Sequence, residues 1–172
     1  MYDNEGVYAA TQAHNAPITN IRCHPSVKNN NLADLYITSS FDWTVKLWST
    51  KSDRPLYTFE SGKDYIFDAQ WSPVHPALFA MGDGTGKLDL WNINKDTEVP
   101  EFSCKLDSLA QGGDTAAISR IGWSDGGDNI AAGTSTGTIH VFNVRPEVGQ
   151  PTNDDAGAFY EKVQKRLTST SA

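Results

Sequence analysis

The fold is decided by residues 39–49, which read Ser39-Ser40-Phe41-Asp42-Trp43-Thr44-Val45-Lys46-Leu47-Trp48-Ser49. The residues before it, Leu35-Tyr36-Ile37-Thr38, are β-branched or aromatic in the main, and such residues favour a strand. Asp42 marks a tight turn, because its short carboxylate can accept hydrogen bonds from nearby backbone N–H groups. From Thr44 to Leu47, polar and apolar residues alternate, as in a strand with one buried face. The segment is therefore predicted to be a hairpin of two strands.

Two features of this hairpin recur along the chain. Apolar triplets spaced i, i+3, i+5 precede a turn at three places: Ile18/Ile21/Cys23, Ile66/Ala69/Trp71 and Ile118/Ile121/Trp123. A strand follows each triplet and ends in Trp48, Trp91 or Phe142. The first two aromatic residues lie 43 positions apart, within the ~40–45 of a four-stranded propeller blade. The next interval is 51 and implies an insertion, which we place at residues 108–115.

The repeat predicts an all-β propeller of about three blades near 14–60, 64–105 and 116–151. Residues 6–12 are expected to be the outer strand of a preceding blade. The expected strands lie near 18–23, 35–40, 44–49, 55–60, 66–71, 77–82, 87–92, 99–105, 118–123, 129–133 and 138–144. Three blades cannot close a ring, since propellers typically have four to eight. Residues 1–151 are therefore interpreted as an incomplete ring, either the C-terminal part of a larger propeller or a truncated form of one.

The last segment, residues 152–172, shows a helical pattern in place of the strand pattern of the repeats. Asn153 or Asp154 is expected to cap a helix there. Its apolar side chains recur every fourth residue and form one stripe: Phe159, Val163 and Leu167. This stripe either packs on the edge of the propeller or docks on a partner, which would use the same spacing of anchors. Residues 168–172 are expected to form a frayed tail.

Composition narrows the classes of function. The formal net charge is −7 and the chain has no basic patch, which argues against nucleic acid as a partner. Cys23 and Cys104 lie far apart and outside any CxxC motif, which indicates a reducing compartment. No apolar run approaches the ~18 residues of a membrane span, and the N-terminus lacks the features of a signal peptide. We expect a soluble, intracellular protein with no membrane partner.

Four residues around the first repeat resemble the hydrogen-bonded tetrad of WD-repeat proteins: His14, Ser40, Asp42 and Trp48. The resemblance implies that Asp42 orients His14 and that His14 contacts the Ser40 hydroxyl. That hydroxyl would in turn contact the indole N–H of Trp48. Such bonds matter because a buried polar group without a partner costs roughly 1–3 kcal/mol. A catalytic Ser–His–Asp interpretation is disfavoured, because a nucleophile needs an exposed cleft and an oxyanion site.

The other two repeats depart from this pattern. Thr85 and Thr136 replace Asp42, and Phe142 has no indole N–H. We therefore expect the second and third blades to rely more on packing.

Two strings resemble enzyme motifs. Residues 133–137 fit G-x-S-x-G, but a strand follows instead of the helix that a nucleophile elbow requires. Residues 82–87 resemble a phosphate loop, but the spacing is one residue short and Leu88 replaces the Ser or Thr. Both are interpreted as hairpin turns. The His and Cys residues show no metal-ligand spacing, so we expect a protein without catalytic residues, cofactor, metal or small-molecule substrate.

Exposed aromatic residues are the candidates for partner contact. Trp43 occupies a turn position where Gly or a polar residue is expected, so it either anchors an interface or folds onto a neighbouring blade. Tyr65 and Phe67, at the entry to the second blade, are a second candidate pair, with burial as the simpler interpretation. Three carboxylates nearby would add an acidic rim: Asp64, Asp68 and Asp83.

Several stretches resemble the WD-repeat region of cytoplasmic dynein intermediate chains, and together they cover nearly the whole chain. The most specific are residues 39–48 and 64–68 with 71–80, followed by 88–92 and 96–100. Weaker similarity continues through 151–154 and the final helix.

The resemblance implies a non-catalytic subunit of the dynein motor, located in the cytoplasm and on microtubules. In that family the propeller binds the dynein heavy chain and so brings other dynein subunits together. Light-chain and dynactin binding belong to a different region of the family and are not carried over. The alternative is a WD-repeat adaptor of another assembly, such as a ubiquitin ligase or a trafficking or ciliary complex.

Overall fold

The structure, a computed structural model, describes residues 10–25, 30–60, 62, 64–106 and 116–170. The insertion expected at 108–115 lies outside the described residues, as do residues 6–9 of the expected outer strand. Residues 10–12 are described and are not in a strand.

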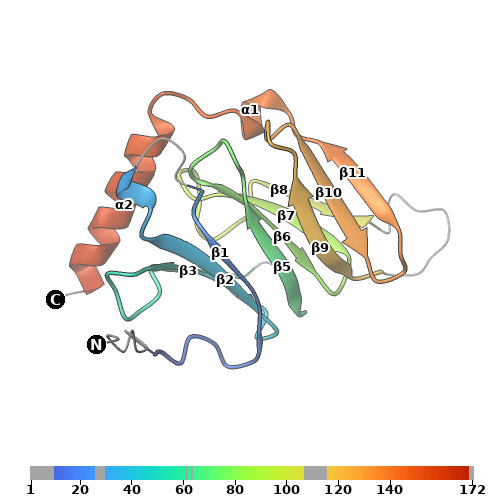
Figure 1. Cartoon of the computed structure of the whole chain (residues 1–172), viewed down its shortest axis with the longest axis horizontal. Helices are drawn as coiled ribbons and strands as arrows, with labels where there is room; N and C mark the ends of the chain where they lie inside the picture. Colours follow the sequence, from blue (N-terminus) through green and yellow to red (C-terminus); the bar gives the residue numbers. More distant parts are fainter. Residues whose placement is uncertain (1–9, 26–29, 61, 63, 107–115, 171–172) are drawn as a thin grey trace, which may run out of the picture.

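The described strands form three antiparallel sheets that stand side by side in an open arc (Figure 1). The first sheet contains β1 (Ile18–Cys23), β2 (Leu35–Ser40), β3 (Val45–Ser49) and β4 (Tyr57–Phe59). The second contains β5 (Ile66–Trp71), β6 (Leu78–Asp83), β7 (Lys87–Asn92) and β8 (Phe102–Lys105). The third contains β9 (Ile118–Trp123), β10 (Asn129–Thr134) and β11 (Ile139–Asn143). Each sheet follows chain order, as expected for propeller blades, and the third has no fourth strand among the described residues.

Burial along the strands reflects their place between neighbouring sheets. Every residue of β6 is buried, because sheets cover both of its faces. β2 is buried except at Tyr36, with the second sheet against one of its faces. In contrast, β11 alternates between exposed and half-buried residues along its length. The sheets therefore pack face to face, and β11 lies at an uncovered end of the arc.

Two apolar cores hold the three sheets together. Between the first and second sheets, β1 and β2 lie against β5, and this core includes Val45, Leu47, Phe59 and Trp91. Between the second and third sheets, β5 and β6 lie against β9. The second core includes Leu88, Leu90, Ile118, Ile121 and Ile130.

The innermost strands are joined by the same hydrogen bond at both junctions. The indole Nε1 of Trp71 donates to the carbonyl oxygen of Arg22 at 3.2 Å. The indole Nε1 of Trp123 donates to the carbonyl oxygen of Gln70, also at 3.2 Å. The donor and acceptor positions match in the repeat, so the two junctions share one geometry.

Asp68 links all three sheets. It is fully buried in β5 and accepts a hydrogen bond from the side-chain amide of Asn20 in β1. Its other oxygen accepts from the backbone N–H of Ile121 in β9 at 2.8 Å. Asp83 is 3% exposed, so neither Asp68 nor Asp83 forms the acidic rim expected from the sequence. Of the three carboxylates, only Asp64 is partly exposed.

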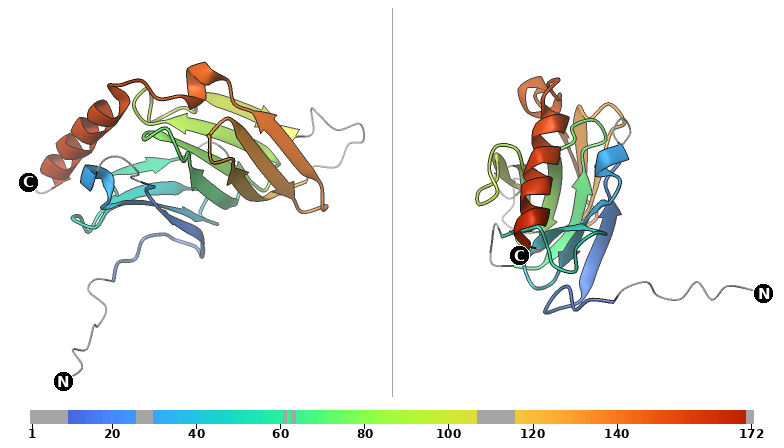
Figure 2. Two further views of the ribbon diagram at one scale, coloured as in Figure 1. Left: turned by 45° about the horizontal axis from the view of Figure 1, so that its top comes forward. Right: turned by 90° about the vertical axis from the view of Figure 1, so that its left-hand side faces the viewer.

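The C-terminal helix α2 (Asp155–Thr170) packs on the first two sheets and away from the third, as Figure 2 shows. Phe159 and Val163 are 0% and 2% exposed in the first core, and Leu167 packs against it. Of the two interpretations left open for the apolar stripe, packing on the propeller is therefore the correct one. Lys162 donates from Nζ to the carbonyl oxygen of Ile93 at 2.6 Å, which ties the helix to the second sheet.

At the start of α2, Asp154 directly precedes the helix and its carbonyl oxygen accepts from the backbone N–H of Ala158 at 2.9 Å, so of the two expected caps Asp154 stands at the cap position. Thr152 also donates from its backbone N–H and its hydroxyl to Asp155 Oδ2, at 2.7 and 2.8 Å. The end of the helix differs from the sequence expectation. The helix continues to Thr170, so residues 168–170 are helical and not frayed.

Two short helices were not predicted. They are the 3-10 helix η1 (Asn30–Leu32) and α1 (Pro146–Gly149). Pro146 stands in the first turn of α1, where its fixed φ and missing N–H are tolerated, and this was the available signal.

Candidate functional site

A chain of buried hydrogen bonds joins three segments of the first blade. Trp48 Nε1, in β3, donates to Thr38 Oγ1, in β2, at 2.9 Å. Thr38 Oγ1 lies 2.6 Å from His14 Nε2, and His14 Nδ1 lies 2.8 Å from Asp42 Oδ2. Each donor finds an acceptor if Thr38 donates its proton to Nε2 and His14 carries its proton on Nδ1. His14 is then neutral and bridges the segment before β1 to the β2–β3 turn.

The prediction that Ser40 provides the hydroxyl of this tetrad is wrong, because Thr38 occupies that place. In the β2–β3 register Tyr36 pairs with Trp48, so Thr38 is the next residue on the same face as the indole. Ser40 lies roughly 7 Å further along the strand. It donates instead to the carbonyl oxygen of Ala16 at 3.1 Å.

Ser40 has a different role, which is to close the turn. Its Oγ accepts from the backbone N–H of Asp42 at 3.0 Å. Asp83 holds the matching position in the second blade and accepts from the backbone N–H groups of Thr85 and Lys87, each at 2.9 Å. Thr134 in the third blade accepts from the N–H of Thr138 at 3.2 Å. One polar side chain at the end of the strand thus closes the hairpin in every blade.

Burial and hydrogen bonding together set the charge state of this network. Burial lowers the pKa of His14 despite the carboxylate beside it. Burial also opposes ionisation of Asp42, but hydrogen bonds from Thr44, Asn15 and His14 outweigh it and lower the pKa of Asp42 to about 2. The pair is therefore a neutral imidazole beside an ionised carboxylate at neutral pH. His14 and Ser40 are 5% and 0% exposed, so both are buried where they hold the turn.

The second blade has no counterpart of the Thr38 hydroxyl. Trp91 pairs with Phe79 as Trp48 pairs with Tyr36, which puts Met81 at the place of Thr38. The indole Nε1 of Trp91 is buried and has no hydrogen-bond partner among the described residues. Met81 and Trp91 therefore contribute packing alone, as expected for a blade without a tetrad.

Trp43 adopts an unusual backbone conformation. Its φ is 74°, and it alone among the described non-glycine residues has a positive φ. Glycine fills the matching turn positions of the other blades, with φ of 74° at Gly86 and 83° at Gly137. A residue with a Cβ costs about 1–2 kcal/mol there. The Trp43 side chain is 45% exposed, so it presents an aromatic surface at the tip of the turn.

The other two candidate aromatic residues lie beside Phe41, which the sequence analysis did not single out. The Phe41 ring centre lies 5.0 Å from that of Tyr65 and 5.3 Å from that of Phe67. Tyr65 is 50% exposed, so its expected burial is wrong, while Phe67 is half-buried. We refer to Phe41, Trp43, Tyr65 and Phe67 as the aromatic patch.

Both ends of the arc expose apolar faces that are buried at the internal junctions. At one end Ile18 and Ile21 are 44% and 52% exposed, whereas their repeat equivalents in β5 and β9 are at most 6% exposed. At the other end Ile139 and Val141 are 70% and 69% exposed, although Val45 and Leu47 hold the same positions in β3 and are fully buried. Each of these two faces therefore resembles one side of a blade junction, with no described sheet packed against it.

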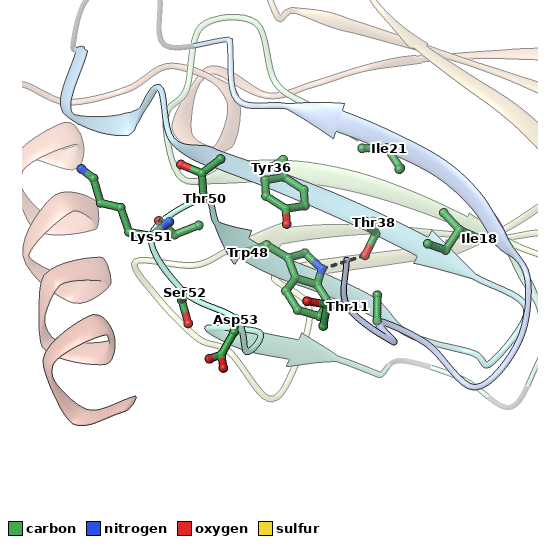
Figure 3. A pocket seen from close by; sticks show the side chains of 12 residues that line it. Thr11, Ile18, Ile21, Tyr36, Thr38, Trp48, Thr50, Lys51, Ser52 and Asp53 are labelled. Atoms are coloured by element: carbon green, nitrogen blue, oxygen red, sulfur yellow. Dashed lines mark hydrogen bonds between the residues drawn. The ribbon is translucent and has the colours of Figure 1, made fainter. Parts of the chain in front are cut away.

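The face at β1 is hollowed (Figure 3). Ile18, Ile21, Tyr36, Thr38 and Trp48 line a space of about 560 Å³, into which the Trp48–Thr38 hydrogen bond also faces. The Tyr36 and Trp48 rings stack at its floor, with centres 6.3 Å apart. In the second blade, the residues equivalent to these five are all buried, at 2% exposure or less: Ile66, Ala69, Phe79, Met81 and Trp91.

In the described part of the chain, no group of three or more His, Cys, Asp or Glu residues gathers in a metal-binding arrangement. The helices of this part are also too short or too polar to span a membrane.

Comparison with known proteins agrees with this geometry. The family described as "WD domain, G-beta repeat" matches residues 6–49, which include the whole tetrad and the β2–β3 turn. The chain is 42% identical over 154 residues to the cytoplasmic dynein 1 intermediate chain of Drosophila melanogaster, over 90% of this chain. The resemblance to the WD-repeat region of cytoplasmic dynein intermediate chains is confirmed. This chain spans 22% of the length of that relative.

A solved structure supports the fold. The WD40 domain of Toxoplasma gondii coronin aligns with a TM-score of 0.62 over 76% of this chain and 32% of that chain. At 20% identity, this likeness concerns the fold alone. The predicted fold class, an incomplete WD-repeat propeller with a short C-terminal helix, is confirmed.

Proposed function

We propose that this chain is part of a non-catalytic scaffold subunit of the cytoplasmic dynein complex, and that its propeller docks on the dynein heavy chain. The observation that carries the proposal is the 42% identity to a cytoplasmic dynein 1 intermediate chain, over 90% of this chain. The similar region includes all three blades, so the similarity covers the part of the propeller on which a partner would dock. This assignment places the protein in the cytoplasm, in association with microtubules and other dynein subunits.

The chemistry of the first blade supports a scaffold over an enzyme. The Ser40, His14 and Asp42 side chains are all bonded to other groups of the same blade. A nucleophile would have to be free to attack a substrate in an accessible cleft. These residues instead hold the β2–β3 turn, on which Trp43 is displayed.

We also propose that further blades of the same polypeptide cover the two uncovered faces. Ile18 and Ile21 at one end, and Ile139 and Val141 at the other, match positions that are buried wherever two blades meet. Side chains of this kind fit another blade better than water, because apolar faces of this extent are rarely left exposed.

The proposal is tested by isolating the tagged full-length protein from cells of its source at moderate ionic strength and quantifying the co-purified proteins by mass spectrometry. A tagged coronin from the same cells is the control for the fold, because it shares the propeller without the sequence similarity. We expect the dynein heavy chain with the protein and not with the control. Recovery of ubiquitin-ligase, trafficking or ciliary components without the heavy chain would instead support the alternative adaptor role.

A further inference from the structure

The turn at Trp43 has a feature that stability does not explain. Gly86 and Gly137 adopt the same left-handed conformation at the same place, and glycine does so without steric penalty. Trp43 incurs that penalty and leaves its large side chain 45% exposed. Backbone strain of this kind is concentrated at functional sites. The position therefore points to a role for the indole outside this chain.

The turn that carries Trp43 also carries one end of a cluster of three rings. Phe41 lies two residues before Trp43 and packs edge-on against Phe67, which supports it from β5. Tyr65 contacts Phe41 and is 50% exposed. The patch thus offers two exposed rings, Trp43 and Tyr65, on a base of partly buried ones. Large, rigid aromatic side chains are the residues that most often dominate binding energy in protein interfaces.

Charge around the patch indicates the chemistry of its partner. Asp64 directly precedes Tyr65 and is half-buried, and the chain has a formal net charge of −7. The Asp42 carboxylate before Trp43 is instead turned to His14, Asn15 and Thr44. Two cations on neighbouring strands are turned to backbone carbonyls: Lys46 Nζ donates to Ala13 at 2.8 Å, and Arg120 donates to Phe67 at 3.3 Å. Aromatic faces also attract cations directly.

We propose that the aromatic patch binds a protein segment in which Lys or Arg flanks aliphatic side chains. The aliphatic groups would cover the Trp43 and Tyr65 rings, and the cations would lie over the rings and towards Asp64. The identity of this partner as the dynein heavy chain rests on the proposed function. The chemistry of the segment rests on the patch alone.

The test uses Trp43→Gly and Tyr65→Ser in the full-length protein, with Phe102→Ser as the matched control. Phe102 is 49% exposed, similar to the two patch residues, but lies on β8 in the second sheet. Binding to the purified tail of the dynein heavy chain is measured by biolayer interferometry. We expect Trp43→Gly to weaken binding at least tenfold and the control to change it less than twofold. Because Gly suits the turn, Tm should stay unchanged or rise by about 2 °C.

A second arm separates this inference from the assignment of the heavy chain. An array of synthetic peptides that combine Leu with Arg is compared with one that combines Leu with Glu. The wild-type protein should be retained only by the Arg peptides, and Trp43→Gly should abolish retention. If the heavy chain fails to bind while this pattern holds, the proposed function is wrong and the patch stands. Equal binding by wild type and Trp43→Gly, or no retention on either array, would overturn the patch.

Discussion

Trp48 and Trp91 occupy matching positions in adjacent blades, but only the indole of Trp48 has a hydrogen-bond acceptor. Trp48 donates to Thr38, whereas Met81 stands at that place beside Trp91. Both side chains are at most 3% exposed. A comparison of substitutions at Trp48 and Trp91 therefore separates the energetic contribution of the tetrad hydrogen bond from that of packing.

We predict that Trp48→Phe destabilises the protein by about 1–2 kcal/mol more than Trp91→Phe. Both changes remove similar volume from a buried site, but only Trp48→Phe removes a hydrogen bond. Trp91→Phe also removes a buried N–H that lacks an acceptor. Urea unfolding followed by circular dichroism measures the two free energies. Equal losses would mean that the tetrad contributes packing only.

Substitution of Gly82 should disturb the junction between the second and third blades. A Cβ at this position would lie 2.5 Å from Ile118 Cγ2, which leaves no room without movement of β9. We expect Gly82→Ala to cost about 1–3 kcal/mol through overpacking. Gly133→Ala is the control, since it holds the matching position in β10 and its nearest contact would be 3.9 Å away. Thermal unfolding should show a lower Tm for the first variant only.

Stability should fall in acid through His14 and Asp42. The pKa of His14 is lowered in the folded protein, so stability is lost as the pH falls below about 6.5, where the unfolded chain takes up the proton. The pKa of Asp42 is also lowered, from 3.8 to about 2, so its contribution of about 2 kcal/mol is lost between those two values. Both effects have the same sign.

Asp42→Asn tests the acid-dependent contribution. We expect the variant to be less stable than wild type at pH 7 and to lose less stability between pH 4 and pH 2. Asp154→Asn, at an exposed position just before α2, is the control. Chemical unfolding at a series of pH values gives the slopes. A parallel dependence in Asp42→Asn and wild type would contradict the assignment.

The uncovered face at β11 should make the isolated chain bind hydrophobic dyes such as ANS. We expect the double variant Ile139→Lys/Val141→Lys to reduce dye fluorescence at unchanged Tm, because both side chains are about 70% exposed. The equivalent change in β7, Leu88→Lys/Leu90→Lys, should abolish folding, since these residues are buried in the second core. Weak dye binding by a cooperatively unfolding wild-type monomer would contradict the incomplete-ring interpretation.

Much of the architecture was predictable because it depends on a repeated pattern. The apolar triplets that contain Ile18, Ile66 and Ile118 lie in the first strand of each sheet, as predicted. The spacing of apolar residues along the chain is sufficient to locate these strands, because equivalent strands of different blades bury the same positions. The short helix at Pro146 was missed because four residues are too few to show a helical period.

The errors at the candidate site have a common cause. Ser40 was predicted from the resemblance in spacing to WD-repeat proteins, whereas cross-strand register decides which hydroxyl meets Trp48. The pairing of Tyr36 with Trp48 follows from the length of the turn and could have identified Thr38. The patch residue Phe41 and the buried Asp68 depend on contacts between sheets, for which a single sequence gives no register.

The repeated Trp hydrogen bond gives the arc a direction. At each junction the later blade donates from its indole, and the earlier blade accepts with a carbonyl group. The two ends of the arc are therefore chemically unlike. Gly122 holds the acceptor position for a blade that would follow, while Cys23 stands where a Trp would donate to a blade that would precede. Blades of this type can therefore associate in one orientation only, in which the indole of the later blade donates to the earlier blade.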